Sequence, residues 1–218
     1  GLTVEQRVIK RALDVVMALF AIVILSPVML LIAGCIKVYD HGPALFVQDR
    51  LTQNGKIFKL YKFRSMSVGI GEGEYCMTRK KDERVTPVGR VIRAIHFDEL
   101  PQLFNILKGE MSFVGPRPEC PALAREYSEE LPEFDYRLKM KAGLTGFAQV
   151  YGKYNTTPYD KLKLDLYYIE NYSLGLDLKL MLMTFKVLFQ KENTEGIDIW
   201  QTNAVVKDQS EHHQVQSK

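Results

Sequence analysis

The chain has 218 residues, of which 46% are hydrophobic and 25% are charged, and its formal net charge is +3. These proportions are those of a globular protein and exclude a wholly disordered chain. The small net charge, without a dense run of lysine or arginine, argues against a nucleic-acid partner. Three scattered cysteines without a C-x-x-C pair give no sign of a zinc site or a disulfide framework, which indicates a reducing compartment.

An uncharged apolar run covers residues 15–36. As a helix it would be roughly 33 Å long, which is enough to cross a bilayer. Pro27, near its middle, has no N–H to offer the carbonyl of Val23 and clashes with that carbonyl, so we expect the helix to bend or break there. The hydroxyl of the preceding Ser26 is placed to satisfy the freed carbonyl.

The charges that flank this run leave its membrane topology open. Basic residues stand on both sides, so the positive-inside rule has no clear winner. One arrangement is a kinked single span, and the other is a re-entrant helix, broken at Ser26-Pro27, with both ends on the cytoplasmic side. The length makes a buried core helix less favoured. The basic residues are Arg7, Lys10 and Arg11 on one side and Lys37, Arg50, Lys56, Lys59 and Lys62 on the other.

Residues 44–66 have the pattern of a small β-hairpin, because Asn54-Gly55 separates two runs with alternating apolar and polar residues. Lys62 and Arg64 stand at alternate positions of the second run, so their side chains would leave one face together. They are candidates for phosphate binding, and a solvated sheet edge is the alternative explanation.

Adjacent carboxylates, Asp98 and Glu99, come directly before a helical pattern that Gly109 ends. A helix N-terminus favours negative charge, so it would keep a carboxylate ionised and attract a phosphate. The alternative is that Asp98 only caps the helix. As a cap, Asp98 would lack one of its two usual N–H donors, because the third helical residue would be Pro101, which has no N–H.

Basic residues lie on both sides of the two acids. Arg90 and Arg93 belong to a short predicted helix or turn over residues 87–95, just ahead of the acids. Pro116 and Pro118 flank Arg117 and restrict its backbone, so its guanidinium group is pre-set for bidentate phosphate binding. Ordinary salt bridging would also explain Arg93, and a rigid turn would also explain the Pro-Arg-Pro element.

The remainder of the chain completes a mostly helical α+β prediction. Two glycines that flank Leu144-Thr145 indicate a tight backbone feature or a turn. Predicted helices follow over residues 158–172 and 176–190, and the second has an apolar face edged with lysines that would suit a membrane surface or a core. We expect a membrane segment over residues 1–40, a catalytic domain over 41–200 and a disordered tail over 201–218.

Taken together, these stretches resemble the catalytic domain of the monotopic phosphoglycosyl transferases, the bacterial sugar transferase family. The resemblance runs from Lys10 to about Lys191, and the order and spacing of its motifs are specific. Those motifs are Lys10-Arg11-x-x-Asp14, Ser26-Pro27, Tyr61-Lys62-Phe63-Arg64-Ser65-Met66, Asp98-Glu99-Leu100-Pro101-Gln102-Leu103, Lys108-Gly109-x-Met111-Ser112, Gly115-Pro116-Arg117-Pro118, Gly143-Leu144-Thr145-Gly146 and Asp165-x-x-Tyr168.

The resemblance implies a monotopic protein with a re-entrant helix, on the cytoplasmic face of the bacterial inner membrane. It also implies Mg²⁺-dependent transfer of a sugar-1-phosphate from a UDP-sugar to polyprenyl (undecaprenyl) phosphate, as an early step of surface-polysaccharide synthesis. By position, Asp98 would be the nucleophile and a metal ligand, and Glu99 a metal ligand or a base. Phosphate would be bound by Arg117, with Lys62 and Arg64 as further contacts.

Two other functions stay open at the level of the sequence. One is a membrane scaffold with this fold and no turnover, and the other is a hydrolase that splits a UDP-sugar. The sequence does not identify the sugar, and the apolar helix faces leave contact with lipid or with another protomer of a homo-oligomer equally open.

Overall fold

The computed structural model describes residues 2–67, 84–152 and 156–188; the predicted tail over 201–218 lies outside them. Within these ranges the chain is mostly helical with two small sheets, as predicted. Its α-helices are α1 (Val4–Asp40), α2 (Pro87–Ala94), α3 (Gln102–Lys108), α4 (Pro121–Glu130), α5 (Phe147–Tyr151), α6 (Pro158–Glu170) and α7 (Leu174–Leu188). Its strands are β1 (Leu45–Leu51), β2 (Ile57–Phe63), β3 (Met111–Val114) and β4 (Ala142–Thr145).

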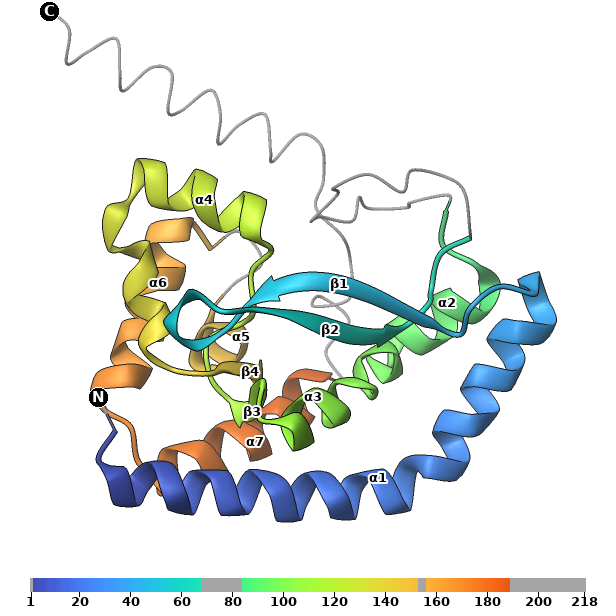
Figure 1. Cartoon of the computed structure of the whole chain (residues 1–218), viewed down its shortest axis with the longest axis horizontal. Helices are drawn as coiled ribbons and strands as arrows, with labels where there is room; N and C mark the ends of the chain where they lie inside the picture. The colour runs from blue at the N-terminus through green and yellow to red at the C-terminus, as the bar shows by residue number, and fades with distance from the viewer. Residues whose placement is uncertain (1, 68–83, 153–155, 189–218) are drawn as a thin grey trace, which may run out of the picture.

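Helix α1 runs along one side of the domain and then turns upward around its end (Figure 1). It continues through Pro27 as one helix, so the predicted break at Ser26-Pro27 is wrong and the helix bends instead. The hydroxyl of Ser26 donates a hydrogen bond of 2.9 Å to the carbonyl of Val23. This is the carbonyl that Pro27 leaves without its helical donor, and the predicted substitute is confirmed.

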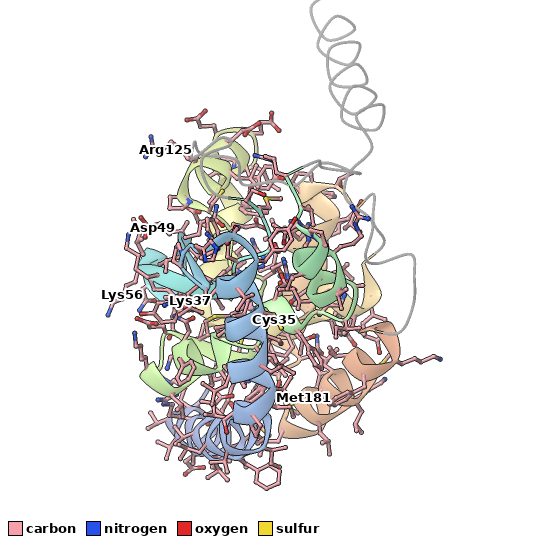
Figure 2. All side chains as sticks on the ribbon, turned by 90° about the vertical axis from the view of Figure 1, so that its right-hand side faces the viewer. Cys35, Lys37, Asp49, Lys56, Arg125 and Met181 are labelled. Carbon is pink, nitrogen blue, oxygen red and sulfur yellow. The ribbon has the colours of Figure 1, made fainter. Side chains whose placement is uncertain are left out.

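Most apolar side chains of α1 face away from the domain. Val23 is 72% exposed and Leu30 is 73% exposed, and Figure 2 shows the second half of the helix from outside, with Cys35 on the outer surface. The helix is long and apolar enough to cross a membrane by length and composition. Its exposure rules out the buried core helix that the sequence left open. The stripe that does pack inward is Lys10, Asp14, Ala18, Met29, Ile32 and Ile36.

Both ends of α1 are tied to the same domain by charged side chains. Near its beginning, the ammonium group of Lys10 lies 2.5 Å from a carboxylate oxygen of Asp177 on α7, and both side chains are buried. At its last residue, Asp40 forms an ion pair with Arg64, which directly follows β2. The long apolar helix therefore wraps around the domain without leaving it.

The predicted hairpin is confirmed. Strands β1 and β2 pair antiparallel, and the turn between them contains Asn54 and Gly55, whose φ angles are 60° and 70°. These positive φ angles are what an Asn-Gly turn supplies at low steric cost. Phe58 and Leu60 of β2 share one face of the hairpin and are buried in a cluster with α1 and α3, whereas Phe63 is buried in a second cluster with α1 and α2.

A second, parallel sheet joins β3 to β4, which the sequence indicated only as a tight backbone feature. Gly143 and Gly146 meet the backbone of Gly115, and a side chain at either position would overlap it. The core cluster beside this sheet combines α1, the hairpin, α3 and both short strands, through Ala18, Phe58, Leu60, Leu103, Ile106, Met111 and Ala142.

Helix α7 packs into the core on one side, as one of its two sequence explanations expects, and is exposed on the other. Its Leu180 is fully buried in a core cluster, whereas its Leu182 and Phe185 are more than 60% exposed.

Candidate active site

Asp98 and Glu99 lie in a single 3-10 turn, Phe97–Glu99, between α2 and α3. His96 precedes the turn with a left-handed φ of 56°, which is uncommon for a residue other than glycine. Helix α3 begins three residues after Glu99, its N-cap is Pro101, and no side chain caps it. The alternative that Asp98 is a helix cap is therefore wrong, and the proline has moved the helix start away from the acids.

Two cations converge on Glu99. Its Oε1 atom accepts a hydrogen bond of 2.8 Å from the ammonium group of Lys62 and one of 3.3 Å from the guanidinium group of Arg117. The Glu99 side chain is 16% exposed and that of Lys62 is 21% exposed, whereas that of Arg117 is 46% exposed. The structure thus unites three residues that lie far apart in the sequence, and it leaves Arg117 partly open to a ligand.

The two carboxylates have opposite electrostatic environments. Burial acts to raise the pKa of Glu99, but Lys62 and then Arg117 outweigh it and hold this pKa well below its usual range. For Asp98, burial and the neighbouring Glu99 raise the pKa, against the weaker opposing effects of Lys62 and Arg93. Asp98 is therefore the more basic carboxylate, contrary to the expectation that a helix end would favour its ionised form. Two carboxylates whose pKa values are shifted in opposite directions suit different chemical roles.

The free oxygens of this pair fit a magnesium ion. Glu99 uses Oε1 for both cations, and among the described residues neither its Oε2 atom nor the Asp98 carboxylate accepts a hydrogen bond. No cluster of three or more potential ligands from His, Cys, Asp and Glu occurs in the described ranges. Mg²⁺ commonly binds through one or two carboxylates together with water and substrate phosphates, so the pair matches its requirements.

The backbone around Arg117 is fixed at four successive carbonyls. Because Pro116 and Pro118 have no N–H groups, this segment is held mainly through its oxygens. The donors are Gly143 N to Pro116 O (2.9 Å), Arg137 Nη2 to Arg117 O (2.9 Å), Arg50 Nη1 to Pro118 O (3.2 Å) and Leu51 N to Glu119 O (2.9 Å). The structure thus contains the rigid turn predicted from the prolines, and this turn places the Arg117 side chain within hydrogen-bond distance of Glu99.

A buried charge network lies behind this turn, and sequence reasoning missed it. Glu119 accepts from Lys161 at 2.7 Å and lies 3.3 Å from Arg137, which also binds Asp165. Burial acts to raise the pKa of Glu119, but Lys161 and Arg137 lower it to about 2. The only available signal was the Asp165-x-x-Tyr168 motif, which gave no role for Asp165.

Of the other two predicted phosphate-binding residues, Arg93 lies near the carboxylates and Arg64 is paired elsewhere. Arg93 lies close enough to Asp98 to oppose the rise in its pKa. Arg64 is buried against Asp40, and no hydrogen bond or ion pair in the described ranges links it to either carboxylate. Arg50, which the sequence did not single out, interacts electrostatically with Arg117, Glu119 and Glu99. Arg50, rather than Arg64, therefore lies beside the charged centre formed by Glu99 and Arg117.

Comparisons of the sequence with known proteins give the family of this chain. The bacterial sugar transferase family matches residues 5–191. The UDP-N-acetylgalactosamine-undecaprenyl-phosphate N-acetylgalactosaminephosphotransferase of Aeromonas hydrophila is 40% identical over 183 residues, which are 83% of this chain and 43% of that protein. The UDP-glucose:undecaprenyl-phosphate glucose-1-phosphate transferase of Caulobacter vibrioides is 41% identical over 189 residues, which are 84% of this chain and 71% of that protein.

A third relative is the exopolysaccharide production protein PSS of Rhizobium leguminosarum, which is 39% identical over 188 residues, or 81% of this chain and 93% of that protein. The chain thus spans less than half of the Aeromonas protein and nearly all of the Rhizobium protein. The named sugars differ between relatives, whereas undecaprenyl phosphate recurs. The family match covers most of the chain and includes the carboxylate pair, the Pro-Arg-Pro turn and the apolar helix, so this chain is a member of the bacterial sugar transferase family.

Proposed function

We propose that this chain transfers a sugar-1-phosphate from a UDP-sugar to polyprenyl phosphate and releases UMP. The observation that carries the proposal is the junction of Asp98 and Glu99 with Lys62 and Arg117, where Glu99 is neutralised by cations and Asp98 accepts no hydrogen bond from the described residues. Relatives that are 40% and 41% identical are named as transferases of this kind. A further relative is named for exopolysaccharide production, which supports a role in surface-polysaccharide synthesis.

In the first step, an oxygen of Asp98 attacks the phosphorus atom that bears the sugar. A bond forms between this oxygen and the phosphorus, the bond from the phosphorus to the bridging oxygen breaks, and UMP leaves with that electron pair. In the second step, a phosphate oxygen of the polyprenyl phosphate attacks the same phosphorus, and Asp98 leaves as a carboxylate. A raised pKa supports this role, because a more basic carboxylate is a stronger nucleophile.

The surrounding cations make an anionic attack on an anionic substrate feasible. Arg117 and Lys62 offer positive charge beside the attacking carboxylate, and Arg93 adds to it from α2. Fixed charges of this kind stabilise developing negative charge without reorganising during the reaction. We assign Mg²⁺ to Asp98 and Glu99, where it would screen the substrate phosphates and polarise the reacting phosphoryl group.

We further propose that α1 enters the bilayer from the cytoplasmic side of the bacterial inner membrane and returns to that side. The ion pairs Lys10–Asp177 and Asp40–Arg64 hold both ends of α1 against one domain, which can lie on only one side of a membrane. A single span would carry these ends to opposite faces. The exposed apolar surface of α1 then seats the active site at the level of the lipid phosphate groups.

The direct test is UMP release from a panel of UDP-hexoses and UDP-N-acetylhexosamines, with Mg²⁺, in the presence and absence of polyprenyl phosphate. We expect one donor or a few related donors to give UMP and a polyprenyl-diphosphate sugar. Free sugar phosphate formed equally well without the lipid would identify a hydrolase. Absence of UMP with every donor would contradict the proposed transfer and favour a scaffold.

A further inference from the structure

We propose that Arg137 is the positioning residue of the active site and sets the place of Arg117 through the backbone that carries it. This inference rests on the proposed function, in which Arg117 binds a substrate phosphate. Arg137 lies in the 3-10 segment Pro132–Lys139, twenty residues after Arg117, and its side chain is 3% exposed. It is too deeply buried to touch a substrate, so any effect on the reaction is indirect.

The guanidinium group of Arg137 is shared between three acceptors. Its Nη2 atom donates to the carbonyl of Arg117 at 2.9 Å, and its Nη1 atom lies 3.3 Å from Glu119, which closes the same turn. Its Nε and Nη2 atoms contact Asp165 of α6 at 2.9 and 2.7 Å. The Arg137 side chain thus contacts the turn on both sides of Pro118 and links it to α6.

Only an arginine can make this set of contacts. The guanidinium group is planar, stays charged and presents its donors in a fixed fork, whereas a lysine offers a single charged atom. The ring of Phe134 lies under the Arg137 guanidinium carbon at 4.8 Å and restricts the group further. A lysine at this position would keep the positive charge between Glu119 and Asp165 and lose the simultaneous hold on the Arg117 carbonyl.

The turn depends on this hold because the backbone N–H donors that support it act at its edges. Gly143 and Leu51 donate from backbone N–H groups to the carbonyls of Pro116 and Glu119, one on each side of the Arg117–Pro118 pair. Between them, the two side-chain donors are Arg137 and Arg50. A shift of the Arg117 carbonyl would rotate the adjoining peptide and move its guanidinium group away from Glu99.

A double-mutant cycle separates positioning from general support of the fold. Arg137→Lys is measured alone, in the Arg117→Ala background and beside wild type, using UMP release at varied UDP-sugar concentration. We expect Arg137→Lys to raise KM roughly 10-fold in the presence of Arg117, with kcat changing less. In the Arg117→Ala background the same change should alter KM less than about 2-fold, because the group to be positioned is gone.

Hydrogen exchange supplies a readout that does not need turnover. The amides of Gly115 and Gly143 bridge the Arg117 turn to β4, through Thr145 O and Pro116 O. We expect Arg137→Lys to speed their exchange by about fivefold or more, while amides of the β1–β2 hairpin keep their wild-type rates. Arg125→Lys is the matched control, because Arg125 is exposed on α4 and points outward in Figure 2.

The outcomes distinguish this inference from the proposed function. Equal KM effects in both backgrounds, or unchanged exchange at Gly115 and Gly143, would overturn the role of Arg137 while leaving the transfer reaction intact. Uniformly faster exchange across the hairpin would also overturn it, because it would mark a general loss of stability. If wild type releases no UMP from any UDP-sugar, the proposed function fails and the exchange measurement alone decides whether Arg137 fixes the turn.

Discussion

Two adjacent carboxylates with opposite pKa shifts define the chemistry at the scale of single residues. Lys62 and Arg117 keep Glu99 ionised, so its negative charge is already paired with these two cations. Asp98 has no hydrogen-bond donor among the described residues and is made more basic by burial and by Glu99. We therefore propose that Asp98 forms the bond to phosphorus and that Glu99 orders the cations around it.

Replacing the two central residues should separate the chemical step from substrate capture. Asp98→Asn removes the nucleophile with little change in shape, and we expect UMP release to fall by roughly 1,000-fold or more. Arg117→Ala should mainly raise KM, by about 10-fold or more, because it removes a phosphate contact. Steady-state UMP release measures both. Full activity of Asp98→Asn would show that another group attacks the phosphorus.

The buried carboxylate of Glu119 should make stability depend on pH. Its pKa in the folded chain is about 2, below the ordinary value of 4.5, so its contribution is present above 4.5 and is lost as the pH falls towards 2. Glu119→Gln should therefore lower the free energy of unfolding by about 3 kcal/mol near pH 7, and this difference should shrink between about pH 5 and pH 2.

Thermal or denaturant unfolding at several pH values measures this effect. Glu129→Gln, an exposed change on α4, is the matched control and should leave both the stability and its pH dependence unaltered. A destabilisation by Glu119→Gln that stays constant across the acid range would mean that the ion pairs with Lys161 and Arg137 are not its source.

At the scale of elements, the parallel pair β3–β4 carries the Arg117 turn. Strand β3 ends at Val114, directly before Gly115, and β4 contains Gly143 and is followed directly by Gly146, the two glycines that contact Gly115. Close backbone approach at this point requires residues without a side chain. The same region ties α1 to β3, because Asp14 accepts hydrogen bonds from Ser112 and Phe113.

Adding one methyl group at this contact should be costly. In Gly143→Ala the new Cβ atom would overlap the backbone of Gly115, and we expect a loss of about 1–3 kcal/mol together with reduced UMP release. Gly34→Ala on α1 is the matched control, because no atom lies within 4 Å of a Cβ atom there. It should be neutral or slightly stabilising. Equal unfolding temperatures for the two variants would contradict this account of the sheet.

Local patterns in the sequence predicted the long helices and the hairpin, but not the second sheet and only part of the site. The Asn54-Gly55 turn and the hydrogen bond from Ser26 to the Val23 carbonyl depend on neighbouring residues, so both were predictable. The pairing of Met111 with Ala142 joins segments thirty residues apart, and each strand has only four residues, too few for a clear alternation. The contacts of Arg137 likewise join a turn to a helix, and no spacing in the sequence reveals them.

At the scale of the whole molecule, one domain holds both ends of an exposed apolar helix. This arrangement predicts that Thr3→Cys and His41→Cys, in a background with the native cysteines replaced by serine, react with an impermeant thiol reagent from the same side of the membrane. Both should be labelled in inverted vesicles and protected in intact cells. Labelling of the two positions from opposite sides would mean that α1 spans the bilayer.

We propose that Asp98 forms a covalent bond to the phosphorus atom of the sugar phosphate. Intact-protein mass spectrometry after incubation with Mg²⁺ and an accepted UDP-sugar, without polyprenyl phosphate, tests it most directly. We predict a mass increase equal to one phosphosugar group, located on Asp98 by peptide mapping, absent in Asp98→Asn and removed when polyprenyl phosphate is added. Release of UMP into polyprenyl-diphosphate sugar without any adduct on Asp98 during turnover would contradict the covalent mechanism.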